Sequence, residues 1–487
     1  MMGKKKSIKK NIAMSTLLTT ANFVFPLITY SYVARVLTPV GTGKVAFVQA
    51  ILQYFSYISI GGIPSYGRRE CARIRDDKRK LSHLVQELLL INLVLVVVAY
   101  VALFTSIIFV PKFHQYRSLF IIMSISIMLE AIGVEWLYQA LEEYSYITIR
   151  SLVCKCVYVF LVFLLIRSEK DYLWYGFLSI FASSASFIFN FVNLKQYISF
   201  EKMESYDFRQ HFKPIWTFFF VFIVITIYSS FDIAMIGFIS TEAEVGLYSS
   251  ALKIKSILLS LSTAVTSVLV PRMAYYFQNR EKEQARKLIV NSMRISMLLA
   301  LPLSVYVYLF ADNILLFVCG SDYIMAKNTL RVLMLCIIPL ILTNLFGNQI
   351  LIPNGQERRY SQSVFVGLWI NLILNILMIP IWGACGAAIG TLVTECWNVY
   401  WMSGGAKEYR ILLLKNIRFI QYIMPLVIGG GCAVTVGKYI MEFSVFWQLC
   451  FTTLVFFIPF YVLLLLTKEP LLIELLIKCS QRKSLNH

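Results

Sequence analysis

The sequence predicts an all-α integral membrane protein with about fourteen transmembrane helices. Of its 487 residues, 58% are hydrophobic, whereas a soluble domain is closer to ~45–50% apolar. The mean hydropathy is +0.70. Apolar runs of about 20 residues, each long enough to cross a bilayer, follow one another with short polar gaps. This arrangement leaves little chain for a separate soluble domain.

We expect a spanning helix wherever about 20 mostly apolar residues occur together. The N-terminal apolar stretch is long, rich in Ser and Thr, and not followed by a small-residue cleavage site, so it is read as a retained first span. The expected spans cover residues 11–36, 44–64, 82–110, 118–139, 145–166, 172–192, 213–238, 246–269, 288–310, 330–352, 361–381, 385–403, 419–438 and 446–466.

Lysine and arginine set the expected orientation of these spans. The net charge is +19, and the cations concentrate in alternate loops. With the N-terminus placed in the cytoplasm, about 31 cations fall on the cytoplasmic side and about 9 on the other. The bias predicts that both termini are cytoplasmic.

Several function classes are disfavoured. The longest polar connections, 193–212 and 270–287, are too short for a nucleotide-binding domain, and no G-x-x-x-x-G-K-[ST] motif occurs, so ATP is not expected to drive the protein directly. The ten cysteines and four histidines lack metal-ligand spacing, and no basic–aromatic pattern suggests nucleic acid. We expect no cofactor and no enzymatic activity. A membrane glycosyltransferase or polymerase would need a D-x-D motif or a large outer loop, and the sequence contains neither.

Related stretches recur about 200 residues apart. Gly43 and Gly246 are both expected where a loop turns into a helix, and the helices that follow are expected to end at Pro64 and Pro271. The order predicts two six-helix lobes related by a pseudo-repeat, with two extra C-terminal helices. The expected parts are an N-terminal lobe (1–200), a C-terminal lobe (201–410), and two helices with a basic tail (411–487).

The sequence resembles a known family in five stretches that occur in order along both halves. They are "RVLTPVGTG" (35–43), "GGIPSYGRRECAR" (61–73), "FDIAMIGFISTEAEVGLYSSALKI" (231–254), "GSDYIMAKNTLRVL" (320–333) and "NLILNILMIPIWGACGAAIGTLVTE" (371–395). Together they look like the Wzx-type polysaccharide-export flippases of the multidrug/oligosaccharidyl-lipid/polysaccharide exporter superfamily.

The resemblance implies a two-lobed, fourteen-helix, MATE-like fold in the bacterial plasma membrane. It also implies the cargo, an undecaprenyl-diphosphate-linked oligosaccharide carried from the cytoplasmic to the outer leaflet by alternating access. Glycosyltransferases and a polysaccharide polymerase would be partners of such a flippase.

Basic residues inside the expected spans fit this cargo. A charge at the centre of a span costs about 2.5–3.5 kcal/mol, and a wet cavity lined by cations could hold the diphosphate. The expected substrate-binding residues are Arg35, Lys155, Lys253 and Arg294. Lys253 and Lys155 lie deepest in their spans. For Arg150 and Lys255, snorkelling to the interface is an equal alternative.

Acidic residues inside the spans have two interpretations. Glu130, Glu135, Asp232 and Glu395 could neutralise neighbouring cations, or they could carry H⁺ or Na⁺ as the coupling ion. The sequence does not separate the two roles.

Two other functions remain open on the same fold. A multidrug/cation antiporter would need acids to meet a cationic drug, whereas the buried cations here are at least as numerous as the buried acids. A lipid II flippase would need a similar cationic cavity, and the sequence separates it poorly from an export flippase.

Overall fold

The computed structural model describes residues 8–203 and 205–474, and this part of the chain is almost entirely helical, which confirms the all-α prediction. The chain forms two compact units, Met1–Gly246 and Leu247–His487. The lobe boundaries expected from the sequence, at residues 200 and 410, stay a prediction.

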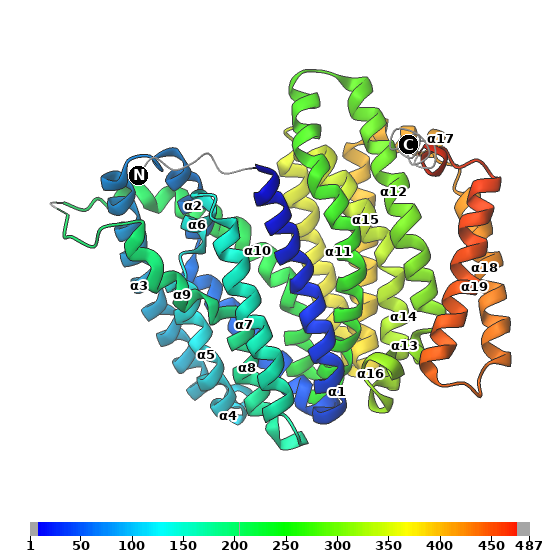
Figure 1. The fold of residues 1–487 in the computed structure, drawn as a ribbon, viewed down its shortest axis with the longest axis horizontal. Helices are drawn as coiled ribbons and strands as arrows, with labels where there is room; N and C mark the ends of the chain where they lie inside the picture. Colours follow the sequence, from blue (N-terminus) through cyan, green and yellow to red (C-terminus); the bar gives the residue numbers. More distant parts are fainter. Residues whose placement is uncertain (1–7, 204, 475–487) are drawn as a thin grey trace, which may run out of the picture. The chain divides into compact units, whose positions relative to one another are not determined.

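In the first unit, helix α1 is the central element. The elements are α1 (Ile8–Ile60), α2 (Ile63–Arg73), α3 (Lys78–Phe109), α4 (Pro111–Gln115), α5 (Arg117–Ile132), α6 (Glu135–Ala140), α7 (Tyr144–Leu165), η1 (Glu169–Asp171), α8 (Tyr172–Ser184), α9 (Ser186–Asn193), η2 (Leu194–Gln196), α10 (Arg209–Ile239) and the start of α11 (Glu242–Gln278). Helix α1 packs against α3, α5, α7 and α10, so it contacts most of the long helices of its unit (Figure 1).

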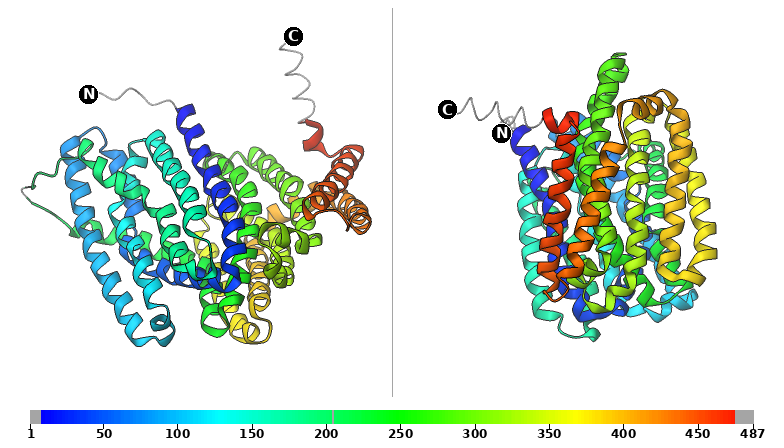
Figure 2. Two further views of the ribbon diagram at one scale, coloured as in Figure 1. Left: turned by 60° about the horizontal axis from the view of Figure 1, so that its bottom comes forward. Right: turned by 90° about the vertical axis from the view of Figure 1, so that its right-hand side faces the viewer.

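The second unit contains the rest of α11 and the elements that follow it. These are α12 (Lys282–Leu309), α13 (Ala311–Val318), η3 (Ser321–Ala326), α14 (Lys327–Leu335), α15 (Ile337–Asn344), the π-helix η4 (Leu345–Leu351), α16 (Glu357–Gly405), α17 (Lys407–Asn416), α18 (Ile420–Tyr439) and α19 (Val445–Leu466). Helix α16 packs on α14 and α15, and α18 pairs closely with α19 (Figure 2).

Two helices are too long for a single crossing and are broken near their middles. Helix α1 has 53 residues, or roughly 80 Å at 1.5 Å per residue, against a hydrocarbon core of roughly 30 Å. It is interrupted at Thr38 (φ 57°, ψ 175°), because the residue before a proline, here Pro39, is disfavoured in helical conformation. Helix α16 has 49 residues and breaks at Gly383 (φ 53°). Both breaks lie in gaps that the sequence predicts between spans.

In the described part of the chain, 9 helices are long and apolar enough to cross a membrane, or 10 if the bent pair Glu169–Ser184 and Ser186–Gln196 is one span. The two long, broken helices α1 and α16 are among them. The exact count of fourteen stays a prediction.

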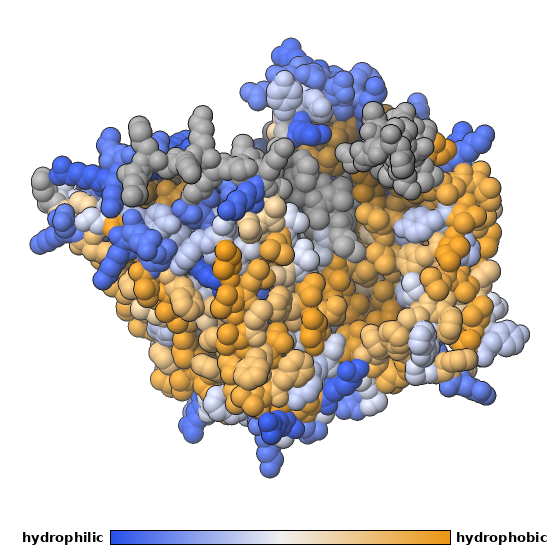
Figure 3. Space-filling view, viewed as in Figure 1, coloured by the Kyte–Doolittle hydropathy of each residue, from blue (hydrophilic) through white to orange (hydrophobic). Residues whose placement is uncertain are grey.

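Hydrophobic side chains cover the outer faces of the spanning helices. Helix α3 exposes a row of them along its middle: Leu90, Leu93, Val94, Val97, Val98, Val101 and Phe104. On the face drawn in Figure 3, hydrophobic side chains gather over the middles of the helices and hydrophilic ones toward the ends. Such an exposed surface suits contact with lipid chains.

The two glycines singled out by the sequence repeat contact each other's segments in the first unit. A Cβ atom on Gly43 would lie 1.8 Å from the carbonyl oxygen of Glu242, and one on Gly246 would lie 2.0 Å from that of Pro39. Only glycine allows backbones to approach this closely. The repeat therefore marks the point where the break in α1 meets the start of α11.

Helix α3 begins with a capped first turn. The Asp77 carboxylate accepts hydrogen bonds from the backbone N–H groups of Arg79 and Lys80, each at 3.1 Å. These bonds, led by the one from Lys80, lower the pKa of Asp77 below its ordinary value. The cap fixes where α3 starts and hence which side chains its next turns present.

The first turns of α3 form hydrogen bonds with residues 194–208, the connector between α9 and α10. Gln86 donates from Nε2 to the carbonyl oxygens of Ser199 (2.7 Å) and Glu201 (3.1 Å). The Ser199 N–H donates to Ser82 Oγ at 2.9 Å. His83 Nε2 lies 2.7 Å from the carbonyl oxygen of Ser205. We call this set of contacts the connector clasp.

Glu87 is the buried centre of the connector clasp. Its Oε1 accepts the Asp207 N–H at 2.6 Å, and its Oε2 lies 2.8 Å from His211 Nε2. His211 Nδ1 in turn lies 2.8 Å from the Tyr66 hydroxyl of α2. Glu87 is 1% exposed and His211 2% exposed. One carboxylate therefore ties α3 to the connector, to the start of α10 and, through His211, to α2.

We predict that Gly43→Ala destabilises the protein by about 2 kcal/mol or more, because the new methyl group would overlap a backbone carbonyl that cannot move without shifting α11. Unfolding in mixed detergent micelles measures the loss. Gly431→Ala is the matched control, since a Cβ there meets nothing within 4 Å, and it should leave stability unchanged or slightly higher. Equal stability of both variants would show that the close approach is unimportant.

We predict that Glu87→Ala lowers stability by about 2–4 kcal/mol, because the Asp207 N–H and the His211 ring lose a buried acceptor. Limited proteolysis should then cut the connector at residues 194–208 faster than in the unaltered protein. Glu201→Ala, an exposed carboxylate in the same connector, should change neither quantity. An unchanged rate of cleavage in Glu87→Ala would refute the role given to the clasp.

Candidate functional site

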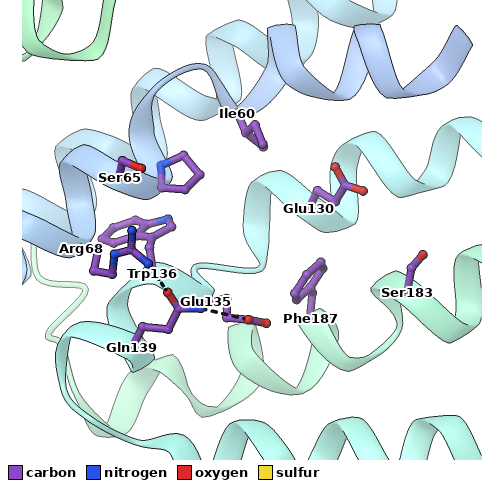
Figure 4. Close-up of a pocket in the computed structure, with 10 residues that line it drawn as sticks. Ile60, Ser65, Arg68, Glu130, Glu135, Trp136, Gln139, Ser183 and Phe187 are labelled. Atoms are coloured by element: carbon purple, nitrogen blue, oxygen red, sulfur yellow. Dashed lines mark hydrogen bonds between the residues drawn. The ribbon is translucent and has the colours of Figure 1, made fainter. Parts of the chain in front are cut away.

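The first unit contains a cavity of about 430 Å³ lined by both polar and aromatic side chains (Figure 4). Its walls come from the end of α1 and from α2, α5, α6, α8 and α9. The lining residues are Ile60, Pro64, Ser65, Arg68, Glu130, Glu135, Trp136, Gln139, Ser183 and Phe187. This volume falls in the range of roughly 300–1,000 Å³ typical of small-molecule sites.

A break between α5 and α6 places two carboxylates on the cavity. Val134 adopts a left-handed conformation (φ 37°), which interrupts the helix between the end of α5 and the start of α6. Glu130 in the last turn of α5 and Glu135 at the first position of α6 therefore both reach the cavity.

Gly67 allows Trp136 to form the cavity wall. A Cβ atom at Gly67 would lie 2.6 Å from Cε3 of the Trp136 ring. The indole consequently packs directly on the backbone of α2 and is 5% exposed. This contact gives a physical reason for glycine within "GGIPSYGRRECAR".

Hydrogen bonds join the polar side chains of the cavity into a chain. Arg68 Nη1 donates to Gln139 Oε1 at 3.1 Å, and Gln139 Nε2 donates to Glu135 Oε1 at 3.2 Å, as drawn in Figure 4. On its other oxygen, Glu135 pairs with Arg150 Nη2 of α7 at 2.8 Å. Arg150 Nη1 also donates to the carbonyl oxygen of Ser186 at 2.6 Å. Glu135 is therefore held from two sides.

Arg150 does not reach an interface. Its side chain is 5% exposed, and the partners just described fix its guanidinium inside the helix bundle. Arg150 thus forms an ion pair inside the bundle and does not snorkel to the interface, and contact of Arg150 with the substrate stays a prediction.

Glu130 lies on the same cavity in a different electrostatic setting. Its carboxylate receives a hydrogen bond from Ser56 of α1. Within residues 8–203 and 205–474, it forms no ion pair with a lysine or arginine. Glu130 is thus a carboxylate inside the bundle without a fixed countercharge, whereas Glu135 has one.

Lys155 is buried between α7 and α1. It is 9% exposed, and its ammonium group donates to the side-chain oxygen of Asn22. Nearby, Thr148 Oγ1 donates to the carbonyl oxygen of Met14 at 3.0 Å. Two polar side chains of α7, those of Thr148 and Lys155, therefore form hydrogen bonds with α1. Lys155 is a buried cation of the first unit, as Arg150 is.

Arg35 and Asp232 occupy less enclosed positions in the first unit. Arg35 is exposed on α1, and Asp232 of α10 is partly buried near Tyr54. The substrate-binding role expected of Arg35 and the coupling role expected of Asp232 stay predictions.

In the second unit, Lys253 of α11 is exposed, whereas Lys255, two residues further on, is 8% exposed. Arg294 of α12 has a structural setting: its Nε lies 3.9 Å from the fully buried carboxylate of Glu469, and its Nη2 donates to the carbonyl oxygen of Asn416 at 3.0 Å. Arg294 therefore ties the middle of α12 to the end of α17 and to Glu469, which follows α19. Substrate binding by Lys253 and Arg294 stays a prediction.

Glu395 is 2% exposed and lies in a polar seam of the second unit. Its Oε2 accepts a hydrogen bond from Thr343 Oγ1 of α15 at 3.0 Å. One turn further along α16, Ser363 Oγ donates to Asn398 Oδ1 at 2.9 Å, which links the two halves of that broken helix. Thr343 is therefore one hydrogen-bond partner of the Glu395 carboxylate.

Sequence reasoning missed three residues of the cavity. Arg68 lies in a run of cations that we interpreted as setting the orientation of the protein in the membrane, so it was not singled out as a site residue. Gln139 and Trp136 follow a turn whose left-handed residue is Val134, a residue type that seldom adopts this conformation, so no local pattern indicates it. Arg68 does lie in the stretch 61–73 that resembles known exporters, whereas Trp136 and Gln139 lie in none of the five stretches.

A bundle of lipid-facing apolar helices with charged side chains fixed inside it is the structure of a membrane transport protein. Residues 8–277 match the family described as "Polysaccharide biosynthesis protein", which is more than half of the chain, and the chain belongs to this family. Residues 218–377 also match the family described as MatE. The resemblance expected from the sequence is confirmed.

Named relatives extend this finding. The chain is 23% identical over 398 residues to a protein of Escherichia coli (strain K12) named "Putative O-antigen transporter", covering 80% of this chain and 95% of that protein. It is 30% identical over 171 residues, 35% of this chain and 36% of the relative, to a protein of Haloferax volcanii named "Probable low-salt glycan biosynthesis flippase".

Solved structures show the same fold. A structure of the lipid II flippase MurJ in an inward closed conformation superposes with a TM-score of 0.69 at 12% identity, covering 93% of this chain and 98% of that one. An inward-facing multidrug resistance transporter of the MATE family gives a TM-score of 0.60 at 13% identity, with 82% and 99% coverage. The predicted MATE-like fold is confirmed.

We predict that Arg150→Met destabilises the protein by about 2 kcal/mol, because Glu135 and the Ser186 carbonyl lose their partner inside the bundle. The double variant Arg150→Met with Glu135→Leu should recover much of this loss. Unfolding of the purified variants gives both values. The exposed pair Arg75–Glu142 supplies the control, since Arg75→Met should cost less than about 1 kcal/mol. A double variant less stable than Arg150→Met would contradict the pairing.

Proposed function

We propose that this protein is a flippase that moves an undecaprenyl-diphosphate-linked oligosaccharide from the cytoplasmic to the outer leaflet for surface polysaccharide biosynthesis. The observation that carries the proposal is the polar interior of the first unit, where Arg68, Gln139, Glu135 and Arg150 form one hydrogen-bonded chain within apolar helices. Membership of a polysaccharide biosynthesis family and the names of the relatives support it.

The physical need for such an interior follows from the cargo. A prenyl chain is compatible with hydrocarbon, but a diphosphate and a set of hydroxyl groups lose their hydration there, at several kcal/mol per ion. Fixed polar groups inside the bundle replace the lost water. Alternating access between the two sides then moves the head group, while the prenyl chain stays in the bilayer.

The proposal includes a location, an orientation and partners. The protein lies in the bacterial plasma membrane with both termini cytoplasmic, as the cation bias indicates. It acts as a transporter, not as an enzyme. Glycosyltransferases supply its lipid-linked substrate, and a polysaccharide polymerase consumes the product on the outer side.

We further propose that an ion gradient, of H⁺ or Na⁺, drives the cycle. Glu130, Asp232 and Glu395 are the acidic residues inside the helices that could carry the ion. Glu130 fits this role best, because it lies on the cavity without a fixed countercharge among the described residues. Arg35, Lys155, Lys253 and Arg294 remain the proposed ligands of the lipid-linked substrate.

Reconstitution into liposomes tests the function. We expect the protein to expose a fluorescent undecaprenyl-diphosphate-linked oligosaccharide to an external glycosidase without ATP, and faster when an H⁺ or Na⁺ gradient is imposed. Liposomes without protein provide the background. Strict dependence on ATP hydrolysis by this chain would refute the energy source. Transport of ethidium but not of the lipid-linked sugar would instead identify a multidrug antiporter.

We predict that Lys253→Ala lowers export of the polysaccharide about tenfold or more, because a hydrogen bond to a charged group contributes about 1.5–3 kcal/mol. Lys253→Arg should retain part of the activity, since it keeps the charge but changes the donor geometry. Surface polysaccharide is measured at matched amounts of inserted protein. Lys327→Ala, which removes a lysine beside Asp312 that is 44% exposed, is the control and should export normally. Normal export by Lys253→Ala would make Lys253 an ordinary surface lysine.

A further inference from the structure

We propose that the cavity of the first unit binds one uncharged sugar ring of the lipid-linked glycan. This inference rests on the proposed function and goes beyond it, because it assigns a separate place to the sugar and states the sugar's charge. The cavity of about 430 Å³ is near the lower end of ligand-site volumes, which suits one or two rings and not a whole oligosaccharide.

The lining has the two kinds of surface that a sugar ring requires. A pyranose presents C–H groups on its faces and hydroxyl groups around its edge. Trp136 and Phe187 supply aromatic surface for the faces. Arg68, Gln139 and Glu135 supply planar polar groups for the edge, with Ser65 and Ser183 contributing hydroxyls at other points of the lining.

The planar groups retain hydrogen-bonding capacity after their mutual contacts. Gln139 uses one donor toward Glu135 and one acceptor position toward Arg68, so its second N–H and a second lone pair remain. Arg68 donates through Nη1 to Gln139, and a guanidinium has five N–H donors in all. Donors and acceptors thus lie side by side, as a pair of neighbouring sugar hydroxyls requires.

These groups are also held in place before a ligand arrives. Arg150 fixes Glu135 through a 2.8 Å ion pair, and Glu135 orients Gln139. Trp136 cannot swing toward α2, because its ring already lies against the backbone of Gly67. A site assembled in advance loses less conformational entropy on binding.

The charges on the lining give an acidic ligand no net attraction. Glu135 is already neutralised by Arg150, which leaves Arg68 as the cation and Glu130 as the anion. An ionised Glu130 makes the lining neutral overall, and a uronic acid or phosphate placed beside it would meet like charge. The cavity therefore suits an uncharged ring, while the diphosphate requires cations elsewhere, such as Lys155 or Lys253.

Equilibrium binding of three defined lipids to the full-length protein in nanodiscs tests the inference. The lipids are undecaprenyl diphosphate, the same lipid with one N-acetylglucosamine, and the same lipid with one glucuronic acid. We expect the N-acetylglucosamine lipid to bind about tenfold more tightly than the sugar-free lipid, as one or two net hydrogen bonds would give. The glucuronic acid lipid should show no such gain.

The variant Gln139→Leu tests whether the gain arises in this cavity. It keeps a side chain of similar size but removes the amide, so the gain from N-acetylglucosamine, relative to the sugar-free lipid bound by the same variant, should fall to about twofold or less. A thermal unfolding midpoint equal to that of the unaltered protein shows that the variant is folded. Gln278→Leu, at an exposed glutamine on α11, is the matched control and should retain the full gain.

Each other outcome has a definite meaning. If undecaprenyl diphosphate binds but neither sugar increases the affinity, the sugar site is refuted while the proposed function stands. If glucuronic acid gives the larger gain, the uncharged class is refuted. If Gln139→Leu keeps the full preference, the sugar binds outside this cavity. If no lipid of the three binds, the proposed function itself fails.

Discussion

Burying a charged group inside a membrane protein costs free energy that a fixed partner of opposite charge offsets, and Arg150 and Glu135 form such a pair beside the cavity of the first unit. The rest of the cavity depends on it. Glu135 orients Gln139, and Gln139 in turn accepts from Arg68 of α2. Through Ser186, Arg150 also joins the start of α9 to α7. Without Arg150, the Glu135 carboxylate would keep only its hydrogen bond from Gln139, and the carbonyl oxygen of Ser186 would lose its hydrogen bond from Arg150.

The two carboxylates on this cavity illustrate how environment assigns different roles to one residue type. Glu135 has a guanidinium at 2.8 Å and therefore behaves as part of the scaffold. Glu130, five residues earlier, has the Ser56 hydroxyl instead, so its charge is not cancelled locally. A carboxylate of the second kind can change its proton or ion occupancy at lower cost to the fold, which is what a coupling residue requires.

Much of the architecture could be predicted from the sequence, because hydropathy and turn chemistry are local. The gap predicted between the spans 11–36 and 44–64 coincides with the break in α1 at Thr38. Gly43 and Gly246 were recognised as equivalent positions, and both prove to be points of close backbone approach. The partners of charged side chains were not predictable, since they depend on tertiary contacts. Arg150 pairs across the α6–α7 turn, and Arg294 meets Glu469, which is 175 positions away in the sequence.

The connector clasp has a consequence for sequence drift among relatives. Five of the contacts that α3 makes with the connector end on main-chain atoms, two on Ser199 and one each on Glu201, Ser205 and Asp207. Replacing an exposed side chain of the connector, such as Glu201, leaves these atoms where they are, so substitutions at exposed positions should be accepted. The buried side chains of Leu194 and Ile198 are constrained by packing, and Tyr206 by its hydrogen bond to Gln86. Inserting or deleting a residue would shift every later carbonyl and amide out of register with Gln86 and Glu87. The segment is therefore expected to vary at its exposed positions but to be constant in length.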